Sequence, residues 1–578
     1  MLAQNREFRY YGETVGTSPD RRESLKALCV FIALTLVMTW PVAARPFQVR
    51  IDSDFDIALF WWNLWWVKRA VWNLHTNPFW CSYLMYPYGV SVVFQAPSYV
   101  YATLSIPVQL LFGFERGVPL STNLVLLGST ILTGWGTWLL ARKITDDARA
   151  AYVAGCIFAF SPFRFYHTAR SHLICTEFLV FYILLFWIAL DNKRRSYAAA
   201  AGLLFAVIVY SSPTYTLYAV WMSVFVAVRF LIISRRDWKK LISQSGVSAS
   251  IAVILSIPWL IAAMKVVGGS DAIIERKYKE LVRYSGDIAG YFFPGKVLKL
   301  LGPVLGKIGD GHWGIIGSEI FIGYSVLALV IVAVIYYLRR GAGFWLASGL
   351  IFWLISLGPR LKIAGSVFFP LPYELLMKLG PIAYLDRAPC RYFVLTLLCF
   401  SIAAAFGAKA ISGEGNRRWV YYVIAALVLI EFFQGPLDMR AVVFPDLYRR
   451  MRRDPEYYAV LDLPMEAPNA QRYARLYQTM HQKPIIHFII PRQRPRYDFF
   501  EDNRFFRDVF DPAPLIEHPD EAVLAANRDM LVKSKIKFVI IHEKLMDPII
   551  YGLVNDLLIR HKPAEIIDEP TLRAFRFY

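Results

Sequence analysis

Repeated segments of close to 20 apolar residues with almost no charge most limit how this chain can fold. Examples are 25–44, 121–141, 247–263, 320–338 and 419–433. A helix of about 20 such residues crosses the roughly 30 Å of hydrocarbon in a bilayer. Hydrophobic residues make up 56% of the chain and charged residues only 19%, below the roughly 25% typical of soluble domains. The sequence therefore predicts an α-helical multispanning membrane protein.

The positive charge of the chain indicates orientation rather than nucleic-acid binding. The net charge is +19, and Lys and Arg lie mostly in short links between apolar segments. Cytoplasmic links are enriched in Lys and Arg, so Arg21, Arg22 and Lys26 place the N-terminus in the cytoplasm. No basic face with stacking aromatic residues occurs outside these links, which argues against nucleic acid as a partner.

Alternation of basic and non-basic links predicts about eleven membrane spans. Residues 92–113 are apolar, but a crossing there would turn every later basic link outward. We therefore assign 45–119 to one long first outer loop, and 1–435 to the transmembrane domain. The spans are predicted at 25–44, 120–141, 149–165, 173–190, 197–212, 215–233, 245–263, 319–338, 343–358, 391–410 and 419–435.

The last part of the chain, 436–578, has a different composition. Charges are common, and short β-rich segments occur at 457–464, 484–490, 535–543 and 572–578, with a helical pattern at 520–534. This pattern predicts a small α/β domain. Because it follows the last outward-going span, we expect it on the extracytoplasmic side.

An acidic cluster stands directly before a group of tryptophans in the first outer loop. Asp52, Asp54 and Asp56 precede a predicted helix at 58–73 that contains Trp61, Trp62, Trp65, Trp66 and Trp72. Tryptophan favours the headgroup level of a membrane, so we expect an amphipathic helix in the interface. Asp52, Ser53 or Asp54 can cap this helix. A carboxylate there can also take a proton from an acceptor hydroxyl, and three acids exceed what one cap needs.

At this point the sequence resembles the GT-C glycosyltransferases, multispanning enzymes that use lipid-phosphate-linked sugars, and in particular a family-39-like branch of them. The matching stretches run in order through most of the chain: "DFDIALFWWNLWWVKRAV", "NPFWCSYLMYPYGVSV", "GCIFAFSPFRFYHTARSHL", "SGDIAGYFFPG", "LPYELLMKLGPIAYLDRAPCRYF" and "YARLYQTMHQKPII". The resemblance implies that an outer-loop Asp is the base or orients the acceptor. Asp54 and Asp56 fit best and Asp52 is second, with a divalent metal at these acids left open.

Other outer-face residues are candidates for substrate binding. His172 and Arg170 follow the third span, where they can form a cationic wall or simply anchor the helix at the interface. Arg387 and Arg391 flank Pro389 and can clamp a lipid phosphate, because the guanidinium fork matches phosphate oxygens, or serve as interfacial anchors. Asp287 is an outward acid that can line the site.

The enzyme hypothesis has two rivals. In the first hypothesis, a sugar moves from a polyprenyl-phosphate donor to an acceptor hydroxyl on a glycan, lipid or protein, at the outer face of the plasma membrane and with inversion. A transporter or flippase of lipid-linked glycans would instead carry ionisable residues at mid-membrane and broken helices. A non-catalytic scaffold of the same fold is the third possibility. The outer-face position of the conspicuous charges favours the enzyme.

Overall fold

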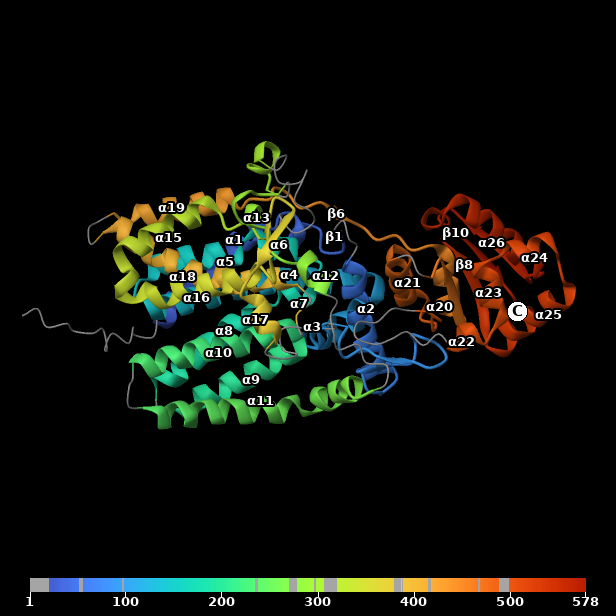
Figure 1. Ribbon diagram of the computed structural model, residues 1–578, viewed down its shortest axis with the longest axis horizontal. Coiled ribbons are helices and arrows are strands. Elements are labelled where there is room, and N and C mark those ends of the chain that lie inside the picture. Colours follow the sequence, from blue (N-terminus) through green and yellow to red (C-terminus); the bar gives the residue numbers. More distant parts are fainter. Residues whose placement is uncertain are drawn as a thin grey trace, which may run out of the picture. The chain divides into compact units, whose positions relative to one another are not determined.

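A computed structural model describes residues 20–50, 56–95, 98–192, 194–233, 237–269, 278–295, 298–305, 320–378, 386, 388–413, 417–465, 468–487 and 498–578. The chain forms two compact units (Figure 1). The helical unit comprises Met1–Pro46, Asn123–Pro258 and Ile274–Met439. The mixed unit comprises Phe47–Thr122, Trp259–Ile273 and Arg440–Tyr578. Most of the predicted first outer loop is thus grouped with the C-terminal segment rather than with the transmembrane helices.

An α-helix lies in each of the predicted spans. The helices are α1 (Arg21–Met38), α4 (Ile106–Thr145), α5 (Ala148–Ala159), α8 (Thr176–Asp191), α9 (Arg195–Ser211), α10 (Pro213–Ile233), α11 (Trp238–Val267), α15 (Tyr324–Tyr337), α16 (Gly343–Ser356), α18 (Phe393–Ser412) and α19 (Trp419–Glu431). Among the described residues, five helical segments are long and apolar enough to cross a membrane: Ile106–Thr145, Ser171–Asp191, Pro213–Ile233, Trp238–Val267 and Pro389–Ser412.

Helix α18 forms the centre of the helical unit. Nearly all of its side chains are buried, and it packs against α5, α15 and α16. Small residues allow this close packing: a Cβ at Gly407 would overlap the backbone carbonyl of Leu329 in α15. The outer helices instead expose large apolar side chains, such as Ile331 and Ile335 of α15 and Leu427 of α19. A helical bundle with an apolar exterior fits a lipid environment.

The segment 92–113 contains only short helical pieces. Helix α3 spans Tyr99–Leu104, and α4 starts at Ile106 but is interrupted at Gly113. Gly113 has φ 69° and ψ −177°, a conformation that a residue with a Cβ rarely adopts. At 1.5 Å of rise per residue, a piece of about seven residues spans only ~10 Å. That the segment does not cross the membrane stays a prediction from the alternation of basic links.

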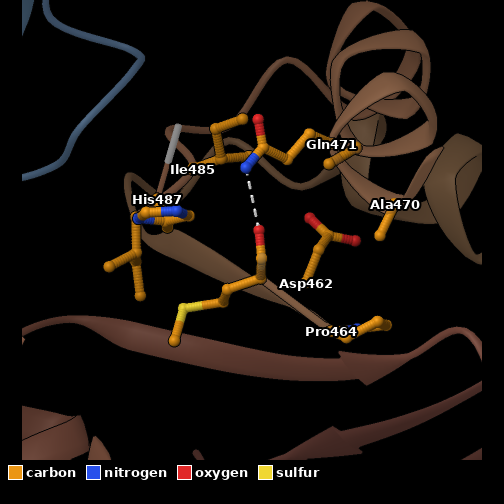
Figure 2. A pocket seen from close by; sticks show the side chains of 9 residues that line it. Asp462, Pro464, Ala470, Gln471, Ile485 and His487 are labelled. Atoms are coloured by element: carbon orange, nitrogen blue, oxygen red, sulfur yellow. Dashed lines mark hydrogen bonds between the residues drawn. The ribbon is translucent and has the colours of Figure 1, made fainter. Parts of the chain in front are cut away.

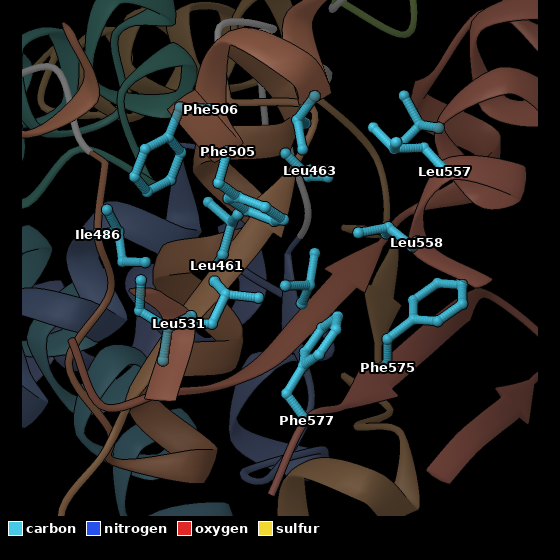
Figure 3. Close-up of a cluster of buried hydrophobic side chains, with 14 of the residues drawn as sticks. Leu461, Leu463, Ile486, Phe505, Phe506, Leu531, Leu557, Leu558, Phe575 and Phe577 are labelled. Atoms are coloured by element: carbon cyan, nitrogen blue, oxygen red, sulfur yellow. The ribbon is translucent and has the colours of Figure 1, made fainter. Parts of the chain in front are cut away.

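The C-terminal segment contains a four-stranded sheet in the order β7-β8-β10-β9. Strands β7 (Ala459–Leu463) and β8 (Ile536–Ile541) are parallel, and β10 (Leu572–Arg576) runs antiparallel to β8 and to β9 (Glu565–Glu569). Helices α25 (Glu521–Lys533) and α26 (Pro548–Arg560) join these strands. Figure 3 shows the buried core, to which Leu461 and Phe575 contribute. The predicted strands at 457–464, 535–543 and 572–578 are present, whereas β9 was not predicted.

The tryptophan-rich helix α2 (Ile57–Lys68) is buried in protein, contrary to the expectation of an interfacial helix. Trp61, Trp62, Trp65 and Trp66 are at most 2% exposed, whereas Trp72 is 54% exposed. Helix α2 packs against α21 (Pro468–His481) of the C-terminal segment. The indole N–H of Trp62 donates to Gln478 of α21 and that of Trp66 donates to the Pro78 carbonyl, so these two rings need no lipid headgroup as a partner.

Gln478 of α21 makes three buried hydrogen bonds, one of them to α2. Its Oε1 accepts the indole N–H of Trp62 at 2.6 Å. Its Nε2 donates to the backbone carbonyls of Tyr83 at 2.6 Å and Lys483 at 3.2 Å. Nearby, Arg69 donates to the Gln482 side chain at 3.3 Å and to the Tyr83 hydroxyl at 3.2 Å.

We expect Gln478→Met to destabilise the mixed unit, because it conserves volume but leaves the Trp62 N–H and two carbonyls without their partner. Each buried group left unsatisfied costs about 1–3 kcal/mol, so the thermal unfolding midpoint of the purified protein should fall by several degrees. Gln482→Met is the matched control, since Gln482 accepts one longer bond from Arg69. An effect no larger than that of the control would contradict this role.

Buried His481 links folding stability to pH. Its side chain is fully buried, its Nδ1 accepts the backbone N–H of Lys483 at 3.0 Å, and its ring packs on Tyr448. Burial lowers the pKa of His481 to about 4; the negative charge of Asp462 opposes this shift and Lys483 adds to it. The unfolded chain takes up the proton near pH 6.5, so the folded state loses stability as the pH falls from about 6.5 to about 4.

We therefore expect the unfolding midpoint of the protein to fall on acidification across this window, and His481→Gln to make the fall shallower. The midpoint measured at several pH values in the same buffer checks this. His518→Gln is the control, because His518 is exposed. An unchanged slope for His481→Gln would exclude His481 as the source.

Candidate active site

Asp56 stands at the start of α2, and its carboxylate faces arginines of α21. No hydrogen bond from the Asp56 side chain caps the helix; its backbone carbonyl instead accepts Leu59 N–H at 3.0 Å. The carboxylate Oδ1 lies 3.8 Å from Nη2 of Arg472, and the two side chains are 24% and 30% exposed. Asp52 and Asp54 lie outside the described residues. The capping hypothesis concerns Asp52, Ser53 and Asp54, and because Ser53 also lies outside the described residues, it stays a prediction.

Arg475 is the second arginine beside Asp56. Burial lowers the pKa of its guanidinium, the negative charge of Asp56 raises it again, and Arg472 lowers it further. An arginine remains protonated under such conditions. Arg472 and Arg475 thus place two positive charges beside the single carboxylate of Asp56. The surroundings of this partly exposed acid are therefore electropositive. Sequence analysis did not single out Arg472 or Arg475, although both lie in the quoted stretch "YARLYQTMHQKPII" or directly before it.

In the helical unit, three predicted binding residues come together from two segments that are far apart in sequence. The charged and titratable neighbours of His172 are Arg391, His167 and Arg170. Arg170 bonds to Nδ1 of His167 at 3.1 Å and lies over the Tyr166 ring, 5.1 Å from its centroid. His172, Arg170 and Arg391 are all partly exposed, so their polar groups can meet a ligand. Arg387 lies outside the described residues.

A buried acid that the sequence analysis missed lies beside Arg391. Asp386 is 2% exposed, accepts the hydroxyl of Tyr218 at 2.5 Å and accepts the backbone N–H of Ala388 at 3.1 Å. The Tyr218 and Tyr392 rings are 4.5 Å apart, and the Arg391 charge acts on Tyr218. The signal was present in the sequence, since Asp386 belongs to the quoted "LDRAPCRYF" element. Asp386 orients the tyrosines next to Arg391.

Asp287, predicted to line the site, binds backbone N–H groups through its carboxylate. Its side chain is fully buried. Oδ1 accepts Ala289 N–H at 3.0 Å, capping α13 (Ile288–Phe292), and Ala364 N–H at 2.9 Å; Oδ2 accepts Gly365 N–H at 2.7 Å. The carboxylate thereby fixes the turn between β4 (Arg360–Ile363) and β5 (Ser366–Pro370). Three backbone donors occupy the oxygens that a substrate would need.

A buried charge pair lies elsewhere in the helical unit. Arg164 and Glu177 are 2% and 1% exposed. Ser129 connects them: it accepts from Arg164 at 3.1 Å and donates to Glu177 at 2.7 Å. Ionisable groups in such surroundings are costly unless paired, and these are paired through hydroxyls. The arrangement is that of an internal link between helices.

Metal binding is not supported by the described residues. No group of three or more His, Cys, Asp or Glu among them is placed to hold a metal ion. Asp56 is the only member of the acidic cluster that the structure describes, so the possibility of a divalent metal at Asp52, Asp54 and Asp56 remains a question for experiment.

Comparison with solved structures places the fold in a known class. The apo oligosaccharyltransferase of Archaeoglobus fulgidus gives a TM-score of 0.53 at 12% identity, over 93% of this chain and 72% of that chain. ArnT from Cupriavidus metallidurans gives 0.41 in the apo state (10% identity, 96% and 98% covered) and 0.40 bound to undecaprenyl phosphate (11%, 95% and 98%). The two ArnT scores are too low to establish a shared fold. The fold assignment therefore rests on the archaeal oligosaccharyltransferase. The chain has the fold of the GT-C glycosyltransferases, as its motifs indicated.

The chain belongs to the family described as a domain of unknown function, DUF6311, which it matches over residues 25–434. No curated protein matches the chain.

We expect Asp287→Ala to lower the unfolding midpoint by several degrees, because three backbone N–H groups lose a charged acceptor and each such loss costs about 1–3 kcal/mol. Glu374→Gln is the control, since Glu374 makes a partly exposed ion pair with Arg360 at 3.3 Å. If the unfolding midpoint of Asp287→Ala equals that of Glu374→Gln, the structural role of Asp287 is contradicted and Asp287 is again a candidate for ligand binding.

Proposed function

We propose that this protein is a membrane glycosyltransferase that moves a sugar from a polyprenyl-phosphate donor to an acceptor hydroxyl, with inversion, at the outer face of the plasma membrane. The GT-C fold supports the class of reaction. The observation that carries the proposal is the position of Asp56, a carboxylate that is partly exposed, does not cap its helix and faces Arg472 and Arg475.

In the proposed reaction Asp56, or Asp54 beside it, takes the proton of the acceptor hydroxyl. The acceptor oxygen attacks the anomeric carbon, the bond from that carbon to the phosphate oxygen breaks, and the lipid phosphate leaves. A positioned base contributes about 10²–10⁴-fold to such a step. Arg472 holds the carboxylate in one orientation, which a base needs to meet the proton.

Arg391 and Arg387 are assigned to the donor phosphate, together with His172 and Arg170. Charges fixed where negative charge develops stabilise a transition state strongly, because they need no reorganisation during the reaction. Tyr218 donates a hydrogen bond to Asp386 and packs on the ring of Tyr392, the residue after Arg391. The N-terminus is proposed to be cytoplasmic and the C-terminal α/β segment extracytoplasmic, where it contributes to acceptor binding.

The test is transfer or donor hydrolysis by the purified protein in lipid, with a panel of polyprenyl-phosphate sugars. We expect Asp56→Asn to lower kcat by about 10²–10⁴-fold with little change in KM for the donor, because the amide cannot accept the proton. Asp54→Asn is run in parallel, since it is the other candidate base.

Asp446→Asn is the matched control, because Asp446 is also an acid paired with an arginine, Arg449, at 2.9 Å, but is 82% exposed. Full activity of both Asp56→Asn and Asp54→Asn at equal folded yield would exclude these acids as the base. No turnover of any donor by the wild type would favour a transporter or scaffold.

A further inference from the structure

A small pocket lies at the carboxyl ends of the two parallel strands of the C-terminal sheet. Asp462, near the end of β7, lines it together with Gln471 and Ala474 of α21 and with Met465 and His487 (Figure 2). In open α/β sheets, ligands bind at the carboxyl ends of the strands. The pocket is far in sequence from Asp56 and plays no part in the proposed transfer step.

The Asp462 carboxylate is buried and only half satisfied. Its side chain is 6% exposed, and Oδ1 lies 2.9 Å from Nε2 of His542, the residue directly after β8. Oδ2 is buried and makes no hydrogen bond to any described residue. Because Leu461 and Leu463 on either side face the core, the alternation of a strand turns Asp462 to the opposite side. An unsatisfied buried carboxylate oxygen calls for a ligand, a water or an ion.

Asp462 forms no ion pair with a lysine or arginine among the described residues; its ion-pair partner is His542, which is charged only when protonated. The groups recorded beside it are His542, His481, Tyr448 and Tyr477. Burial lowers the pKa of His481 to about 4, so this ring is neutral at physiological pH. A buried carboxylate without a counter-charge is unfavourable. The pocket is thus suited to a cation and repels phosphate or carboxylate groups.

The size and walls of the pocket limit the cation further. Its interior has room for about one water molecule, which excludes a whole sugar ring but admits one terminal group. The Gln471 amide is held by its own bond to the Met465 carbonyl at 3.0 Å, as Figure 2 shows. The described residues offer too few metal-binding side chains for a metal ion. An ammonium group matches water in size, carries three donors and has the required charge.

We propose that this pocket binds the primary ammonium group of a ligand, with Oδ2 of Asp462 as its acceptor and counter-charge. His542 holds the carboxylate in position from the strand side. Met465 and Ala474 cover the carbon that bears the amine. An amino sugar and a small amine such as a lipid headgroup both supply this chemistry.

The test is saturation-transfer NMR on the full-length protein in phosphatidylglycerol nanodiscs, which contain no amine lipid. Ethanolamine and glucosamine are the probes, and ethylene glycol and N-acetylglucosamine are their neutral counterparts. We expect saturation transfer to at least one amine and at least tenfold weaker transfer to its neutral counterpart. Response to glucosamine alone identifies an amino sugar, and response to ethanolamine alone identifies a small amine.

Two variants assign the site. Asp462→Asn removes the counter-charge, and Ala474→Leu fills the pocket while leaving Asp462 in place; each should abolish the amine signal. Asp568→Asn, an exposed acid paired with Arg573, should keep it. Equal transfer to the neutral probes, a signal that persists in both folded variants, or no signal from either amine would each overturn the proposal, the last indicating that only water occupies the pocket. None of these NMR measurements requires the protein to turn over a glycosyl donor.

Discussion

The hydrogen bond between the Trp62 indole and the Gln478 amide holds together two segments that are 416 residues apart in sequence. Gln478 also donates to two backbone carbonyls, so both the oxygen and the nitrogen of its amide are hydrogen-bonded. The bond satisfies the buried indole N–H of Trp62, whereas the buried indole N–H of Trp61 makes no hydrogen bond to any described residue. With α2 held along α21, Asp56 at the end of α2 meets Arg472. The packing of α2 against α21 therefore brings Asp56, the candidate base, next to Arg472.

Helix α21 places two acids in opposite electrostatic settings. Asp56 lies beside Arg472 and Arg475, whose two positive charges exceed the single negative charge of its carboxylate. Gln471 and Ala474 line the pocket of Asp462, whose hydrogen-bond partner is the imidazole of His542 and which forms no ion pair with a lysine or arginine of the described residues. A carboxylate flanked by arginines has a fixed orientation, whereas a carboxylate without a counter-charge attracts a cation. The first setting suits chemistry on a hydroxyl and the second suits recognition of an amine.

Much of the helical unit could be predicted because hydrophobic length and the alternation of basic links report directly on membrane crossing. The strands β7, β8 and β10 were also predictable from their β-branched and aromatic residues, while β9 was missed because "EIIDE" carries three acids. His172 and Arg391 were found from their positions near span ends. The sequence did not indicate that the Asp287 carboxylate accepts three backbone N–H groups, because a carboxylate that binds backbone and one that binds substrate have the same sequence signal.

By itself, the sequence determined that the chain is a bundle of membrane helices followed by an α/β segment, because these features depend on local periodicity and composition. Only the tertiary structure decided that Trp61, Trp62, Trp65 and Trp66 face protein rather than lipid. It also decided that Asp56 faces arginines and that Asp462 is left with an unsatisfied oxygen. A side chain's burial and its partners depend on which distant segment packs against it, and no local pattern in α2 encodes the presence of α21.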